Sequence, residues 1–147
     1  MTRFIRNIIS IIFIYNFISC SAYALDIGAN ATSTVNTDSN VLQKFTGSNA
    51  TLKVIDGATL ERANQPSLIN EQTGGTVIVE SGSTISATVA NTIQGIDSAN
   101  LTITNSGTIK AGTSKAINLT DNEGARVTNN AGAIIQSDTN TISLSEN

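Results

Sequence analysis

Glycine recurs at one constant interval through most of this 147-residue chain, at Gly57, Gly82, Gly107 and Gly132. Each glycine ends a short run in which apolar and polar residues alternate, as in Val77–Gly82. Such alternation is typical of a strand with one buried face. A constant period of about 25 residues indicates units that cannot bury their apolar edges alone, which favours a solenoid.

Aliphatic residues follow the same period to within one residue. We expect four stacked columns: Leu60–Ile85–Ile109–Ile134, Ile69–Ile93–Ile117–Ile142, Leu52–Val77–Leu101–Val127 and Leu119–Leu144. A fifth column, Val54–Val79–Ile103, ends at Asn129. At the turns, Asn105 is expected to stack on Asn130, and Ser81 on Ser106, as hydrogen-bonded or simply turn-forming residues.

The fold predicted from these columns is all-β: a parallel β-helix, or β-solenoid, with coils of about 25 residues. Each coil would contain three short strands and stack at the usual interstrand distance of ~4.8 Å. Helical repeats are disfavoured because Thr, Ser, Asn, Val and Ile are poor helix formers. Another all-β form and a largely disordered chain stay open as alternatives, since only 29 of residues 25–147 are Leu, Ile, Val or Phe.

Residues 1–24 are predicted to be a cleaved signal peptide. Arg3 and Arg6 precede an apolar run over 8–18, and the small residues Ala22 and Ala24 stand before Leu25 in the pattern that a signal peptidase reads. The apolar run is too short for a membrane anchor, which needs roughly 20 apolar residues. Cys20 fits a lipoprotein box poorly, because Phe17 occupies the position where Leu is usual.

The remaining chain divides into two parts. Residues 25–50 fit the repeat badly and are expected to form an N-terminal cap or an irregular first coil. Residues 51–147 are expected to form the β-solenoid repeats, and Thr141–Leu144 is still in phase with the period near the end of the sequence.

Three segments carry a resemblance to a known family: LTITNSGTIK at 101–110, AINLTD at 116–121 and VTNNAGAI at 127–134. They resemble passenger-domain repeats of bacterial autotransporters, the exported β-helical surface proteins of Gram-negative bacteria. The resemblance implies an adhesin-like or structural segment at the cell surface, the outer membrane or outside the cell. It also implies partners among surface components of host or neighbouring cells.

The family's membrane β-barrel has no counterpart in this sequence. Such barrels need aromatic girdles, and Phe45 is the only aromatic residue after position 24. The resemblance therefore implies an N-terminal fragment whose missing barrel is the membrane anchor, or a short secreted solenoid. No transmembrane segment is expected in the mature chain.

The chemistry of the sequence points away from catalysis. There is no His, and Cys20 is the only cysteine, so a Ser–His or Cys–His dyad, a zinc cage and an intrachain disulfide are all excluded. A net charge of −3 argues against nucleic-acid binding. The run 107–114 imitates a phosphate loop but places Thr113 where the loop needs Lys.

We therefore predict no catalytic residue, no cofactor and no metal site. The alternative is an enzyme acting on polysaccharide, for which Asp56 and Glu80 are candidate paired carboxylates. It is disfavoured because the basic residues Arg62 and Arg126 lie in different repeats at unmatched phases. A remnant of a truncated gene without activity is the third possibility.

Overall fold

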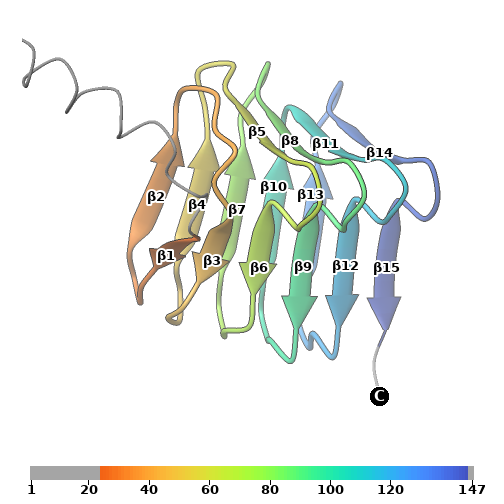
Figure 1. Ribbon diagram of the computed structural model, residues 1–147. Coiled ribbons are helices and arrows are strands. Elements are labelled where there is room, and N and C mark those ends of the chain that lie inside the picture. Colours follow the sequence, from red (N-terminus) through yellow and green to blue (C-terminus); the bar gives the residue numbers. More distant parts are fainter. Residues whose placement is uncertain (1–23, 146–147) are drawn as a thin grey trace, which may run out of the picture.

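A computed structural model describes residues 24–145 and shows an all-β chain wound as a parallel β-solenoid (Figure 1). The predicted fold class is therefore confirmed. The signal-peptide prediction lies outside the described residues, except that Ala24 precedes the first strand and Leu25 begins it. The fifteen strands of the described residues are β1 Leu25–Ile27, β2 Thr32–Val35, β3 Gln43–Phe45, β4 Thr51–Val54, β5 Thr59–Arg62, β6 Leu68–Asn70, β7 Thr76–Val79, β8 Thr84–Ala87, β9 Ile93–Ile96, β10 Thr102–Asn105, β11 Thr108–Ala111, β12 Ile117–Thr120, β13 Arg126–Asn129, β14 Ile134–Ser137 and β15 Ile142–Ser145.

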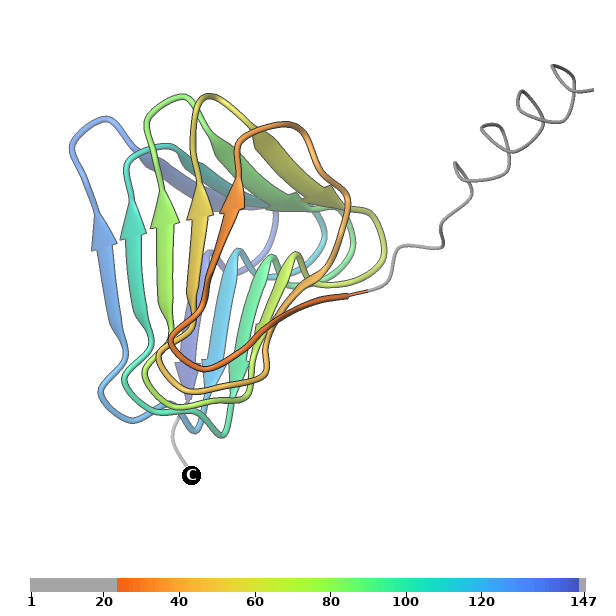
Figure 2. The same cartoon turned by 90° about the vertical axis from the view of Figure 1, so that its left-hand side faces the viewer.

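Three parallel sheets surround one aliphatic interior (Figure 2). Sheet A has the order β1-β3-β6-β9-β12-β15, sheet B the order β13-β10-β7-β4-β2, and sheet C the order β14-β11-β8-β5. Each coil, meaning one turn of the solenoid, passes through sheets B, C and A in that order. Four complete coils follow one another: β4–β6, β7–β9, β10–β12 and β13–β15.

The coils differ slightly in length, as the register of sheet B shows. The coil from Thr76 to its partner Thr102 is one residue longer than the coil from Thr51 to Thr76, and the coil from Thr102 to Arg126 is one residue shorter. The first turn, β1–β3, is much shorter than these, because Thr32 already pairs with Thr51. The corners absorb these differences, so the strands keep the alternation that buries one face.

Stacked aliphatic side chains form the core, and the strands pair them in columns. Leu60, Ile85 and Ile109 stack as predicted, but the fourth member is Ile135, not Ile134. Ile134 pairs with Thr108 on the outer face and is 47% exposed. The step from β11 to β14 is one residue longer than the step from β5 to β8, which moves the inward position to the next residue.

Two further columns differ from the prediction by one member each. Leu68, not Ile69, stacks under Ile93 and Ile117, because Ile69 pairs with Gln94 on the outer face. Ile103, not Leu101, stacks between Val77 and Val127. Leu101 is fully buried too, but it precedes β10 at the corner. The Leu119–Leu144 pairing is as predicted.

The third complete coil has a shortened corner. Four residues (80–83) separate β7 from β8, whereas two (106–107) separate β10 from β11. Asn105, not Ile103, stacks on Val79, because the coil from Thr76 to Thr102 is one residue longer than the coil before it. After the shortened corner, the partner of Asn105 on the next coil is Asn129, not Asn130. Ser106 correspondingly lies beside Glu80 rather than Ser81, since its N–H donates to the carbonyl of Val79.

The corner between sheets A and B repeats one backbone conformation in every turn. Five residues there have φ between 56° and 76°, the left-handed region that Asn and Gly tolerate: Asn30, Asn49, Gly74, Asn100 and Gly124. The side chains of the asparagines occupy the space above the glycines. A Cβ added at Gly74 would lie 2.1 Å from Oδ1 of Asn49.

Candidate functional site: outer threonine columns and a polar groove

Threonines form straight columns on the outer faces of two sheets. On sheet B, Thr32, Thr51, Thr76 and Thr102 are in register on four neighbouring strands. On sheet C, Thr59, Thr84 and Thr108 do the same on three strands. They alternate with buried residues along each strand, so they point away from the core and remain partly accessible. Each column presents hydroxyl and methyl groups at the interstrand spacing of ~4.8 Å.

A groove lies beside β5, where the first turn of the solenoid is incomplete. β5 is the edge strand of sheet C, and from the preceding turn only Ser39 forms a bridge, with Leu60. The N–H of Ser39 donates to the carbonyl of Thr59 (2.8 Å), and the N–H of Glu61 donates to the carbonyl of Ser39 (2.9 Å). The chain then turns away toward β3. The result is an open groove of about 960 Å³.

Polar side chains line this groove. Its lining residues are Asp38, Ser39, Asn40, Thr59, Glu61, Arg62, Ala63, Asn64 and Gln65. Arg62 donates to the backbone carbonyl of Asn40 and to Oε1 of Gln65 (2.7 Å). Asp38 accepts a hydrogen bond from the N–H of Thr59 (2.8 Å). Arg62, Gln65 and Asp38 therefore hold the groove wall together, while the side chains of Glu61 and Asn64 are exposed beside them.

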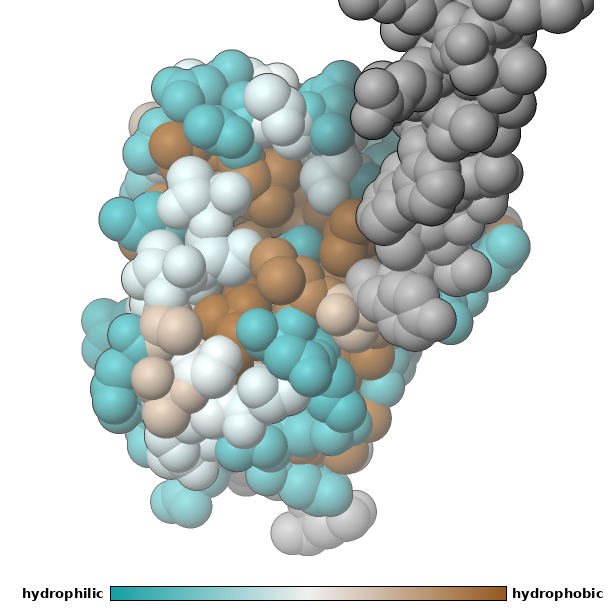
Figure 3. Space-filling view, turned by 60° about the vertical axis from the view of Figure 1, so that its left-hand side comes forward, coloured by the Kyte–Doolittle hydropathy of each residue, from teal (hydrophilic) through white to brown (hydrophobic). Residues whose placement is uncertain are grey.

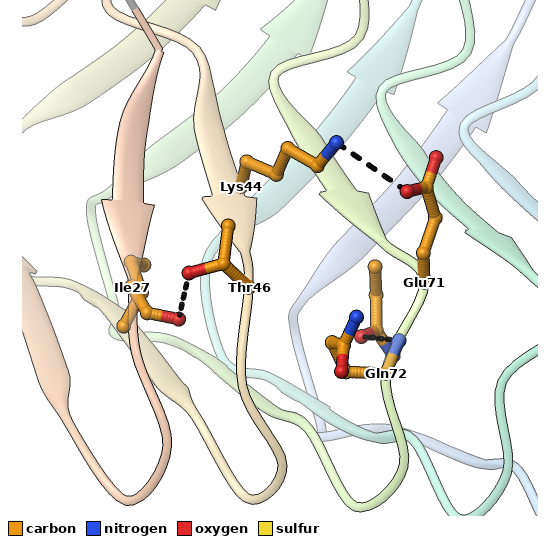
Figure 4. A network of polar contacts seen from close by, with 6 residues as sticks. Ile27, Lys44, Thr46, Glu71 and Gln72 are labelled. Atoms are coloured by element: carbon orange, nitrogen blue, oxygen red, sulfur yellow. Dashed lines mark hydrogen bonds and ion pairs between the residues drawn. The ribbon is translucent and has the colours of Figure 1, made fainter.

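A second polar cluster lies on sheet A, between the first and second turns (Figure 4). Lys44 forms an ion pair with Glu71 at 3.3 Å, and both side chains are more than one-third exposed. The hydroxyl of Thr46 donates to the carbonyl of Ile27 (3.4 Å), and the N–H of Gln72 donates to Oδ1 of Asn70 (3.0 Å). The first two contacts link neighbouring turns of the solenoid, and the third holds the corner that follows β6. An exposed ion pair of this kind contributes at most about 1 kcal/mol to the stability of the fold.

The candidate carboxylates of the sequence do not align. Glu80 lies beside Ile55, since its N–H donates to the carbonyl of Val54, and Asp56 is one position further along the corner. Both are exposed. Arg62 lines the groove, whereas Arg126 begins β13 in the last coil. The run 107–114 is not a free loop, because residues 108–111 form β11.

Sequence reasoning missed the groove. It singled out Arg62 but neither Asp38 nor Glu61, and Asp38 was missed because residues 25–50 were treated as an undivided irregular segment. A signal was present: Asn30 and Asn49 occupy equivalent left-handed corners, yet they lie closer together in the sequence than one full coil allows. A turn this short leaves no room for a strand on sheet C between β2 and β3, and the absence of that strand opens the groove.

Within residues 24–145, no three acidic or cysteine side chains gather closely enough to hold a metal ion. Over the same range there is no helix with the length and apolarity that crossing a membrane requires. Comparison with models of protein families, with curated proteins and with solved structures finds no match to this chain.

Proposed function

We propose that this chain is an exported β-solenoid module that serves as a structural or adhesive segment at the surface of a Gram-negative cell or outside it. The observation that carries the proposal is the set of threonine columns on sheets B and C. Regular outer faces of small hydroxyl and methyl groups suit broad contact made of many weak interactions. The expected partners are surface components of host or neighbouring cells.

The likeness of the repeats at 101–134 to autotransporter passenger segments supports the same proposal. A passenger segment is a rigid β-helical rod, and this chain has the parallel solenoid that such a rod requires. In this reading the chain is the N-terminal part of a longer passenger, and a membrane barrel encoded further on would anchor it.

Export is tested by expressing the full chain with a C-terminal epitope in a Gram-negative bacterium. We expect the epitope in the periplasm or medium, on a chain whose first residue is Leu25. Ala24→Arg should block cleavage, since the peptidase needs a small residue there. A soluble cytoplasmic chain that still begins at Met1 would contradict export.

Adhesion is tested separately with particles coated with the chain and incubated with cells. Thr76→Arg places a large charged side chain in the middle of the sheet B column and should reduce the number of bound particles. Gln94→Arg is the matched control, because Gln94 is an equally half-buried outer residue of the same coil on sheet A. Equal binding by the wild type and by uncoated particles would refute an adhesive role.

A polysaccharide-acting enzyme is the second candidate, and the groove beside β5 is the observation that favours it. Asp38, Glu61 and Arg62 line one hollow, which brings two carboxylates and a basic side chain together. Against it, Asp38 and Arg62 are already engaged with the groove wall. Turnover of a polysaccharide that is lost in Glu61→Gln but kept in Glu80→Gln would establish the enzyme and displace the adhesive proposal.

A further inference from the structure

A short segment of the first turn covers the edge of sheet C at β5. We call this segment, residues 36–42 between β2 and β3, the strap. A strand edge with free N–H and C=O groups is a template for pairing with another chain. Apolar surface lies in the middle of this end of the solenoid, among polar side chains (Figure 3). A strand added here would therefore gain apolar contact as well as hydrogen bonds.

The hydrogen bonds on the other side of β5 show which of its backbone groups face this edge. The N–H of Thr84 in β8 donates to the carbonyl of Ala58, so the even-numbered residues of β5 face β8. The direction of the backbone groups alternates along a strand. Thr59 and Glu61 therefore direct their N–H and C=O groups toward the edge, where a neighbouring strand would bind them.

The strap occupies these groups one by one. Ser39 pairs in register with Leu60: its N–H donates to the carbonyl of Thr59 (2.8 Å), and its carbonyl accepts from the N–H of Glu61 (2.9 Å). The carboxylate of Asp38 accepts the N–H of Thr59 (2.8 Å), where a full strand would supply a backbone carbonyl. A segment too short to be a strand thus binds three edge groups of β5.

The strap also prevents the pairing from continuing along β5. The hydroxyl of Ser39 accepts from the N–H of Val41 (3.3 Å), which turns that donor back onto the strap. The guanidinium of Arg62 donates to the carbonyl of Asn40, so this acceptor is occupied too. Arg62 also brings charge to the edge, and charged side chains are one means by which edge strands resist pairing with other chains.

We propose that the strap is an edge guard, which keeps β5 from pairing with a second copy of this chain. A second copy presents the same edge, and two identical edges can pair antiparallel about a two-fold axis. The inference does not rest on the adhesive function, because the threonine columns lie on the outer faces of the sheets and the guard acts at a strand edge.

Sedimentation of the full chain under reducing conditions tests the guard. Ser39→Pro removes the N–H that binds Thr59. It should raise the sedimenting mass to that of a dimer or a larger assembly, at concentrations where the wild type has the mass of one chain. Thr37→Pro is the matched control, because it places proline in the strap where none of the described backbone bonds to β5 is made. Equal masses for a folded Ser39→Pro chain and the wild type would overturn the proposal.

Substitutions at Asp38 open the edge without the backbone effects of proline. Asp38→Ala leaves the N–H of Thr59 without its acceptor and should increase association, whereas Asp38→Asn keeps an acceptor oxygen and should leave the mass unchanged. This pair decides the question if Ser39→Pro fails to fold. Unchanged mass in Asp38→Ala, or equal association in both variants, would overturn a guard that acts by occupying the edge.

A proline on β5 itself shows whether the association uses this edge. Glu61→Pro removes an N–H that faces the edge, a position where edge strands tolerate proline. Added to Asp38→Ala, it should return the sedimenting mass to that of the wild type, while circular dichroism reports that the strand content is kept. Association that persists in the folded double variant would place the contact elsewhere and overturn the proposal.

Discussion

Asn105 occupies an interior position that aliphatic residues fill in the two preceding coils. Its neighbours in the column are Val79 and, one coil further, Val54. The side chain is fully buried and fully engaged: it donates to Oδ1 of Asn129 (2.8 Å) and to the carbonyl of Ile134 (2.9 Å), and it accepts from the N–H of Gly107 (3.2 Å). The amide therefore replaces backbone partners that the two-residue corner cannot supply.

Asn105→Val should destabilise the protein although it completes a valine column. It leaves the carbonyl of Ile134 and the N–H of Gly107 without their partner, which costs about 2 kcal/mol in the free energy of unfolding. Urea denaturation measures the loss. Asn130→Ala is the control, because its bond to Ser106 is exposed and its removal should cost no more than about 0.5 kcal/mol. A more stable Asn105→Val variant would contradict this role.

Gly107→Ala should be more damaging than the same change at the other glycines of the period. A Cβ at position 107 would lie 2.3 Å from the carbonyl oxygen of Ser83 and 2.4 Å from that of Glu80. Both are backbone atoms, so the corner must shift, at a cost of about 2 kcal/mol or more. Gly57→Ala meets no atom within 4 Å and should cost only about 1 kcal/mol, from its φ of 76°. Thermal unfolding of both variants shows whether this order holds.

At the scale of the strand, the period of the sequence located the elements but not always the side that each residue faces. The alternating runs that end at Gly82, Gly107 and Gly132 predicted strands, and β7, β10 and β13 lie before these glycines. Where two aliphatic residues adjoin, as in Ile134–Ile135 and Leu68–Ile69, the period fits either. Corner length decides between them, and corner length depends on contacts such as that of Asn105 that no local pattern reveals.

Alanine substitutions in sheet C test whether Ile134 or Ile135 is the inward residue of β14. Ile109→Ala removes a fully buried side chain from the middle of the column and should lower the free energy of unfolding by about 3 kcal/mol. Ile134→Ala removes an outward side chain and should change it by less than about 1 kcal/mol. A large loss at Ile134 and none at Ile135 would restore the column expected from the sequence.

At the scale of the molecule, the repeats in the sequence predicted the solenoid architecture, but they did not predict the groove beside β5. The same core pattern is repeated in every coil. The fold class can therefore be predicted correctly even when the position of an inward residue in one coil is wrong by one. The groove arises where repetition fails, in the first turn around Asp38 and Ser39. A feature that occurs once has no second copy in the sequence to compare with.

Protection of backbone amides should fall toward the β13–β15 end. Coils β7–β9 and β10–β12 have a coil on each side, whereas β13–β15 pair with one coil only. Hydrogen exchange followed by mass spectrometry should show β14 and β15 opening first because local stability follows contact density. Uniform protection of all four coils would mean that the solenoid opens as a single cooperative unit.

Corners that accept coils of unequal length have a consequence for how such a gene can change. Loss or gain of one codon at a corner leaves every strand facing the same way, whereas the same event inside a strand exchanges its inner and outer faces. Insertions and deletions in descendants of this chain should therefore occur mainly at the corners. Duplication of a whole coil would lengthen the solenoid while every strand kept the same inward and outward faces.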